Sequence, residues 1–343
     1  MACPDKYKEM NSFYKYYSGE KVAPVLTIFI GGNHEASNYM QELFYGGYVA
    51  RNIYYIGCAG VINVGGLRIC GMSGIYNQYH YENPVGSRYE HPPYTPSSQR
   101  SVYHVRPLQV MQLKMISEKV DVFLSHDWPR GICSHGDVNK LLSQKKFLRQ
   151  EINENSLGSP ASEELLHALK PSYWFCGHMH VKFPAIVQHD TSQTKFLALD
   201  KCLPGRSFMQ FLDDIGGNHD MTIYHDKEWL AILHSTQQYV AHKTKDLPSV
   251  EFFTGMLETS REIVASLFPS LESLRIEDDS SARTAQPYVP VGTRKYRFKG
   301  CYPPMQHGNL QTDILLSKLG LYHVAPVTIP LSQPDDNEID IGI

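Results

Sequence analysis

Hydrophobic residues along the chain fall into short runs that polar and glycine-rich segments separate. Several runs of four to eight residues are rich in Val, Ile, Phe and Tyr, which is typical of buried strands. Gly65-Gly66 is expected to form a hairpin turn between two of these runs. We expect strands at about 25–30, 52–57, 60–64, 67–71, 120–124, 173–176, 181–188, 195–200 and 208–212.

Other segments carry apolar residues at the three- to four-residue spacing of a helix. Ser159-Pro160 has the residue types that favour the N-cap and first position of one of them. Strands predominate after these helices, so the sequence predicts an α+β fold with mixed sheets rather than a strictly parallel sheet. We expect helices at about 35–43, 106–118, 138–152, 161–169, 227–242 and 250–267.

The composition changes near residue 226, where a strand-rich part gives way to amphipathic helices. We therefore expect one domain over 1–226 and a second over 227–331, with a polar, proline-containing linker at 277–290. The acidic tail at 332–343 is expected to be flexible.

Composition limits the possible classes of protein only broadly. The chain has 343 residues, 42% of them hydrophobic and 20% charged, with a net charge of −3, which is ordinary for a soluble globular protein. No global charge points to a polyanionic partner, so any nucleic-acid site must be local. The seven cysteines form no C-x-x-C pair, which favours free thiols in a reducing compartment. No signal peptide or membrane-spanning segment is visible, and we expect an intracellular protein.

Potential metal ligands follow three of the expected strands, namely Asn33-His34, His126 and His178-Met179-His180. Alone, an Asn-His pair is usually a turn, a single His is usually structural, and an H-x-H is structural about half the time. At three strand ends, where a sheet places catalytic groups, they favour a common site. Alternation along an extended segment would put His178 and His180 on one face, able to serve two ions about 3.5–4 Å apart. The pattern indicates part of a two-metal phosphoesterase centre.

Residues 76–106 are rich in Tyr, His and Arg, and prolines interrupt their middle. Two interpretations remain open. The segment is a surface loop packed by its own aromatic rings, or it is a platform that stacks unpaired bases and holds phosphates. In the second case the candidate RNA-binding residues are Tyr76, Tyr79, Tyr103, His104 and Arg106.

These motifs resemble known families. Asn33-His34-Glu35, His126-Asp127-Trp128-Pro129 and His178-Met179-His180 are similar to the motifs of calcineurin-like metallophosphoesterases. The longer strings at 13–20, 30–38, 157–161 and 196–204 resemble the family of RNA lariat debranching enzymes, with a weaker resemblance at 311–320. The resemblance implies an αββα sandwich with mixed sheets and a C-terminal accessory region. It also places residues 76–106 where the family carries a loop that recognises the lariat.

The resemblance implies hydrolysis of the 2′,5′-phosphodiester at the branch point of excised intron lariat RNA, by a metal-activated hydroxide, in the nucleus. Asn33, His126 and His178 would hold one divalent ion and His180 would help to hold a second, the ions being Fe, Zn or Mn. His34 would be the general acid near the leaving 2′ oxygen. Branched RNA would be the partner, and no membrane would be involved.

The resemblance also exposes a departure. Family members open with a strand bearing Cys-x-His or Asp-x-His and a second strand ending in Gly-Asp, and neither is found before Asn33. We therefore expect an incomplete second metal site, tight binding of at most one ion and slow cleavage, unless acids such as Asp127 or Asp200 complete the site. The alternative is a branched-RNA-binding short form with little or no activity. A third possibility is a general phosphomonoesterase, which the aromatic segment and the string at 196–204 disfavour.

Overall fold

The computed structural model describes residues 10–83, 94–212, 215–240, 247–278 and 309–321. The strands are β1 Thr27–Phe29, β2 Gly47–Ala50, β3 Ile53–Tyr55, β4 Ala59–Val64, β5 Leu67–Met72, β6 Val122–Ser125, β7 Tyr173–Cys176, β8 Phe183–Gln188, β9 Gln193–Ala198 and β10 Ile223–His225. The α-helices are α1 Tyr14–Tyr17, α2 Ser37–Glu42, α3 Gln78–Glu82, α4 Ser98–Ser101, α5 Pro107–Lys114, α6 Val138–Gln144, α7 Arg149–Asn153, α8 Pro160–Leu169, α9 Lys227–Thr236, α10 Thr254–Leu267 and α11 Leu310–Lys318.

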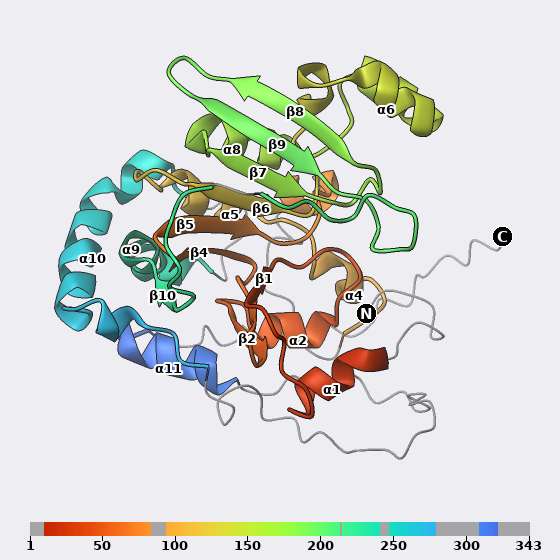
Figure 1. The fold of residues 1–343 in the computed structure, drawn as a ribbon. Helices are drawn as coiled ribbons and strands as arrows, with labels where there is room; N and C mark the ends of the chain where they lie inside the picture. The colour runs from red at the N-terminus through yellow and green to blue at the C-terminus, as the bar shows by residue number, and fades with distance from the viewer. Residues whose placement is uncertain (1–9, 84–93, 213–214, 241–246, 279–308, 322–343) are drawn as a thin grey trace, which may run out of the picture.

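The strands form two sheets. The larger has seven strands in the order β10-β4-β5-β6-β7-β9-β8, and the smaller has three in the order β1-β3-β2. Strands β5, β6, β7 and β9 run parallel, whereas β4, β8 and β10 are antiparallel to their neighbours. Figure 1 shows the large sheet from β8 at the top towards β10 at the lower left, with the small sheet and α1 and α2 below it. The expectation of mixed sheets is confirmed.

Three hydrophobic clusters divide the molecule into layers. Ile62, Ile69 and Leu124 on one face of the large sheet pack with Tyr54 and Ile28 of the small sheet. The opposite face of the large sheet, with Phe123 and Trp174, joins a cluster that includes residues of α5, α8 and α9. The outer face of the small sheet packs against α1 and α2 through residues such as Leu43 and Val49. Strand alternation thus produces the expected αββα sandwich.

Local signals explain most of the element boundaries. The β4–β5 hairpin closes at Gly65-Gly66, both with positive φ (59° and 76°), as a two-residue turn requires. Helix α8 begins as expected, because the Ser159 side chain accepts a hydrogen bond from the Ser162 amide and Pro160 occupies the first turn.

Some expected elements differ in the structure. No strand forms at 208–212; among these residues Phe211 is 79% exposed, and no neighbouring strand pairs with the segment. The helix expected over 138–152 is divided into α6 and α7 by a short 3-10 helix at Lys146–Leu148. Strands β2 and β10 were not expected, because runs of three or four residues carry too little periodicity to identify.

Helices α9 and α10 share the main hydrophobic cluster with α5 and the large sheet. The division into domains at 226 stays a prediction. Most of the expected linker at 277–290 lies outside the described residues, and so does the whole expected tail at 332–343. Cys58, Cys70, Cys133, Cys176 and Cys202 are free thiols. Within the described ranges, no helix combines the length and apolar character needed to cross a membrane.

Candidate metal centre and RNA-binding surface

Three of the expected metal ligands lie side by side beyond the carboxyl ends of β1, β6 and β7. His126 Nε2 is 3.2 Å from Asn33 Oδ1 and 3.1 Å from His178 Nδ1. Adjacent ligands of one ion are roughly 3.0–3.4 Å apart when each lies about 2.0–2.1 Å from the ion. The three side chains therefore have the spacing of ligands around a single divalent cation.

Hydrogen bonds of backbone and side-chain groups hold the loops that carry these residues. The Gly177 amide donates to the His126 carbonyl oxygen at 3.2 Å, and the Trp128 indole Nε1 donates to the Gly177 carbonyl oxygen at 2.7 Å. These two bonds join the loop after β6 to the loop after β7. On the other side, the Gly31 amide donates to Ser73 Oγ at 3.0 Å and the Gly74 amide donates to the Gly31 carbonyl oxygen at 2.8 Å. Asn33 is therefore positioned from β5 as well as from β1.

Gly32 leaves the space in which the His126 ring lies. A Cβ atom at residue 32 would be 2.7–2.9 Å from three atoms of that ring, closer than side chains tolerate. The sequence has a Gly-Gly pair directly before Asn33, but only the fold brings Gly32 against the His126 ring.

We expect Gly32→Ala to displace the His126 ring and to lower the affinity for a divalent ion by about 10–100-fold, the usual effect of disturbing the support of a ligand. Isothermal titration with Zn²⁺ or Mn²⁺ measures this. Gly177→Ala is the matched control, because a Cβ at Gly177 would meet nothing within 4 Å. Equal losses in the two variants would contradict the steric explanation.

The H-x-H segment is not an extended strand, and that part of the expectation was wrong. Strand β7 ends at Cys176, and His178 and His180 both have positive φ, 62° and 54°. Residues other than glycine rarely adopt this conformation, and those that do are concentrated at functional sites. The orientation of the two imidazoles is therefore set by a turn with two left-handed residues, not by strand alternation.

His34 and His180 lie close enough to His126 for their charges to act on it. Burial, and after it the charges of His178, His180 and His34, lower the pKa of His126 to about 4. The neutral imidazole is the form that binds metal. His34 itself is exposed to solvent, and its backbone amide donates to Glu35 Oε2 at 3.1 Å.

The two acids that were considered for the second ion are engaged elsewhere. Asp127 is buried; its Oδ2 accepts from the Tyr76 amide and its Oδ1 from the Trp128 amide, each at 3.1 Å. Burial raises the pKa of Asp127. Asp200 Oδ1 accepts from the Arg206 guanidinium at 2.8 Å and from the Lys201 amide at 2.6 Å.

The donor set fits one ion and only part of a second. Over the residues that the structure describes, no three His, Cys, Asp or Glu side chains are placed to hold an ion together. Asn33 supplies a neutral oxygen to the first position, beside the two imidazoles. That His180 helps to hold a second ion stays a prediction.

The aromatic residues at the two ends of the 76–106 segment are stacked on one another. The His80 and His104 rings lie 4.7 Å apart, and their Nδ1 atoms are 2.6 Å apart. Tyr79 packs edge-on against His80, and Tyr103 against His104. Residues 84–93, between these ends, lie outside the described residues. His80 was not among the expected RNA-binding residues, although its place between Tyr79 and Tyr81 is an available signal.

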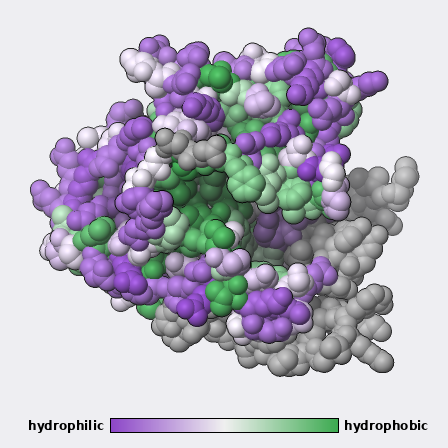
Figure 2. All heavy atoms as spheres, in the orientation of Figure 1, coloured by the Kyte–Doolittle hydropathy of each residue, from purple (hydrophilic) through white to green (hydrophobic). Residues whose placement is uncertain are grey.

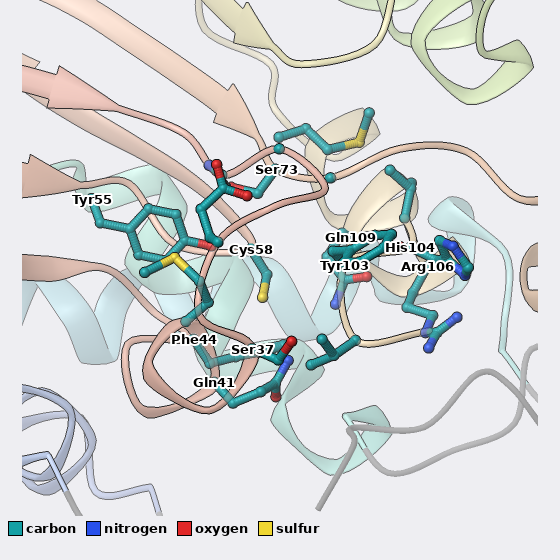
Figure 3. A pocket seen from close by; sticks show the side chains of 18 of the residues that line it. Ser37, Gln41, Phe44, Tyr55, Cys58, Ser73, Tyr103, His104, Arg106 and Gln109 are labelled. Carbon is teal, nitrogen blue, oxygen red and sulfur yellow. Dashed lines mark hydrogen bonds between the residues drawn. The ribbon is translucent and has the colours of Figure 1, made fainter. Parts of the chain in front are cut away.

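A cavity of about 60 Å³ lies beside this cluster. Its lining includes Gly31 and Gly32. Figure 3 shows Tyr103, His104 and Arg106 on the side of the cavity that faces Tyr55 and Cys58. Arg106 is buried, and its Nη2 donates to the Ser101 carbonyl oxygen at 2.8 Å. Tyr79 is the most exposed of the candidates at 61%. RNA binding by Tyr76, Tyr79, Tyr103, His104 and Arg106 stays a prediction.

Acid should destabilise this aromatic cluster. Burial, with His80 and Arg106, lowers the pKa of His104 to about 3, so below about pH 6.5 the unfolded chain binds a proton that the folded chain does not. The free energy of unfolding should fall as the pH falls from about 6.5, by less than about 1.4 kcal/mol per pH unit for this group because solvent partly screens the ring. Urea denaturation between pH 7 and 4.5 should show a shallower fall for His104→Gln, and identical slopes would contradict this assignment.

Comparison with known proteins identifies the class of this fold and site. The model of the calcineurin-like phosphoesterase family matches residues 4–182, and the model of the lariat debranching enzyme C-terminal domain matches residues 191–324. The chain is 56% identical to the lariat debranching enzyme of Danio rerio over 337 residues, which cover 94% of this chain and 57% of the relative. It is 47% identical to the lariat debranching enzyme of Arabidopsis thaliana over 330 residues, covering 95% of this chain and 76% of the relative.

The chain is 46% identical to the lariat debranching enzyme A of Xenopus laevis over 339 residues, which cover 94% of this chain and 61% of the relative. The chain thus spans about three-fifths of the length of the two vertebrate relatives. The chain belongs to the lariat debranching enzyme family, within the calcineurin-like phosphoesterases. The resemblance noted in its motifs is confirmed.

Proposed function

We propose that this chain hydrolyses the 2′,5′-phosphodiester at the branch point of excised intron lariat RNA. The observation that carries the proposal is the convergence of Asn33, His126 and His178 within 3.1–3.2 Å at the carboxyl ends of three strands. The relatives named lariat debranching enzymes support the choice of substrate. Branched RNA is the proposed partner, and the nucleus, where introns are excised, is the proposed location.

The proposed roles of the residues follow from their positions. Asn33, His126 and His178 would hold one divalent ion, and His180 would help to hold the second; Fe, Zn and Mn all suit these donors. When bound, such ions activate water and neutralise charge on the phosphate. His34 would donate a proton to the departing 2′ oxygen, a role that suits an exposed imidazole beside the metal ligands.

The second candidate is a branched-RNA-binding form without turnover. It is favoured by one observation, namely that no three His, Cys, Asp or Glu side chains among the described residues are placed to hold an ion together. In that case the aromatic cluster would bind RNA and the metal centre would bind at most one ion tightly.

One experiment separates the two. Metal content of the purified chain is measured by mass spectrometry, and cleavage is followed on a synthetic 2′,5′-branched RNA, a linear 3′,5′-linked RNA of the same sequence, and a phosphomonoester. Metal-dependent cleavage of the 2′,5′ bond alone supports the proposed hydrolase. Preferential binding of branched RNA without cleavage supports the binding form, and hydrolysis of the monoester alone would indicate a general phosphatase.

A further inference from the structure

The turn that carries His180 is contacted by a separate loop. Residues 199–207 follow β9 and return to the end of β7, where the Leu199 amide donates to the Cys176 carbonyl oxygen at 2.9 Å. The loop is closed on itself by the Asp200 amide, which donates to the Ser207 carbonyl oxygen at 3.1 Å. It therefore forms a fixed support beside the H-x-H turn.

Arg206 of this loop bonds directly to the turn. Its Nη2 donates to the carbonyl oxygen of His180 at 3.0 Å and to Asp200 Oδ1 at 2.8 Å. Asp200 is held in turn by the Lys201 amide, which donates to the same oxygen at 2.6 Å. The Asp200 side chain is only 9% exposed, whereas that of Arg206 is 43% exposed. One guanidinium nitrogen thus joins a fixed carboxylate to the peptide group of His180.

This contact occurs where the backbone needs support. His180 has a φ of 54°, in the left-handed region that costs free energy for residues other than glycine. A conformation of this kind persists only where neighbouring groups hold it, and a hydrogen bond to the carbonyl oxygen fixes the peptide plane next to His180. The direction of the imidazole depends on that plane.

We propose that Arg206 and Asp200 are positioning residues for His180, which hold its left-handed backbone so that the imidazole faces the metal centre. The proposal rests on the proposed function, because it takes His180 as a metal ligand. His180 lies in the segment matched by the calcineurin-like phosphoesterase model, whereas the loop lies in the segment matched by the lariat debranching C-terminal domain model. The part of the chain specific to the debranching family thus orients a residue of the general phosphoesterase site.

The test uses the full chain and three variants, Arg206→Ala, Arg206→Lys and Asp200→Asn. Arg275→Ala is the matched control, since Arg275 is 44% exposed and also pairs with a carboxylate, at Glu272. Binding of Co²⁺ is measured by calorimetry and by visible absorption, which reports the geometry of the ligands. We expect Arg206→Ala to weaken Co²⁺ binding by about 10–100-fold, Arg206→Lys to restore part of the loss, and Arg275→Ala to change nothing.

A double variant distinguishes positioning from general damage. If Arg206 acts only through His180, then His180→Ala and the pair His180→Ala/Arg206→Ala should bind Co²⁺ equally weakly. In the metal-free chain, Arg206→Ala should speed hydrogen exchange in the peptide 177–181, and Arg275→Ala should not. Unchanged Co²⁺ affinity in Arg206→Ala, or additive losses in the double variant, would overturn the positioning role alone. Unchanged affinity in His180→Ala would overturn the assignment of His180 as a ligand, and with it the positioning role. The proposed hydrolysis, which rests on Asn33, His126 and His178, would instead fail if the chain did not cleave the 2′,5′-branched RNA.

Discussion

Replacing His34 by Ala should lower the rate of 2′,5′-bond cleavage by roughly 10²–10⁴-fold and leave the metal content unchanged, the usual range for loss of a general acid. His34 is exposed, whereas the close ligand contacts of the site join His126 to Asn33 and His178. His126→Ala should differ, because it removes the central ligand and should empty the position that the three residues share. Single-turnover cleavage and metal analysis of the same preparations measure the two effects.

A change of leaving group isolates the proton donation. An aryl phosphodiester releases an anion that needs no proton, so His34→Ala should hydrolyse it at close to the unmodified rate. Loss of metal in His34→Ala would reassign the residue as a ligand. An equal loss of rate on both substrates would exclude the general-acid role.

Replacing Arg68 by Met should destabilise the fold by about 3–5 kcal/mol, the usual cost of removing one partner of a buried ion pair. Arg68 in β5 donates to both carboxylate oxygens of Asp226 and to Glu228 Oε2, each at 2.8 Å, and its side chain is 7% exposed. Without the guanidinium, two buried carboxylates would share a site without a cation between them. The expected loss is therefore electrostatic in origin.

The size of the effect also tests how α9 is attached. Asp226 caps α9 by accepting from the Trp229 amide at 2.9 Å, so Arg68 links the large sheet to the start of that helix. Arg261→Met is the control. Arg261 also contacts Glu228, at 2.8 Å, but its side chain is 45% exposed. Its replacement should therefore lower the free energy of unfolding by less than about 1 kcal/mol. Urea denaturation compares the two variants, and similar losses would contradict the importance of burial.

The face of the molecule seen in Figure 2 has a hollow in which apolar side chains gather, between more polar margins. Partly buried residues such as Leu26, Ile28 and Ile30 border the cluster between the two sheets. Leu26, Ile28 and Ile30 are alternate residues of the strand expected at about 25–30, so they share one face of an extended segment. How far the two sheets cover them depends on pairing between distant strands, which local sequence does not specify.

The sequence alone was sufficient to predict most elements of the sandwich and the residues that converge at its centre. The strand runs before Asn33, His126 and His178 carried strong local signals. His126 and His178 follow neighbouring parallel strands, β6 and β7, whose carboxyl ends meet on one edge of the large sheet, whereas Asn33 follows β1 of the small sheet. The hairpin at Gly65-Gly66 and the start of α8 at Ser159-Pro160 were predictable for the same reason, since short-range chemistry determines them.

Tertiary structure alone decided how the site is supported. The left-handed turn at His178 and His180, the place of the His126 ring beside Gly32, and the bond from Arg206 to the His180 carbonyl oxygen join segments far apart in sequence. The strand expected at 208–212 did not form because strand formation depends on a paired neighbour, not on β-propensity alone. Local patterns therefore identified Asn33, His126 and His178 as residues that come together, and long-range packing set the directions in which their side chains point.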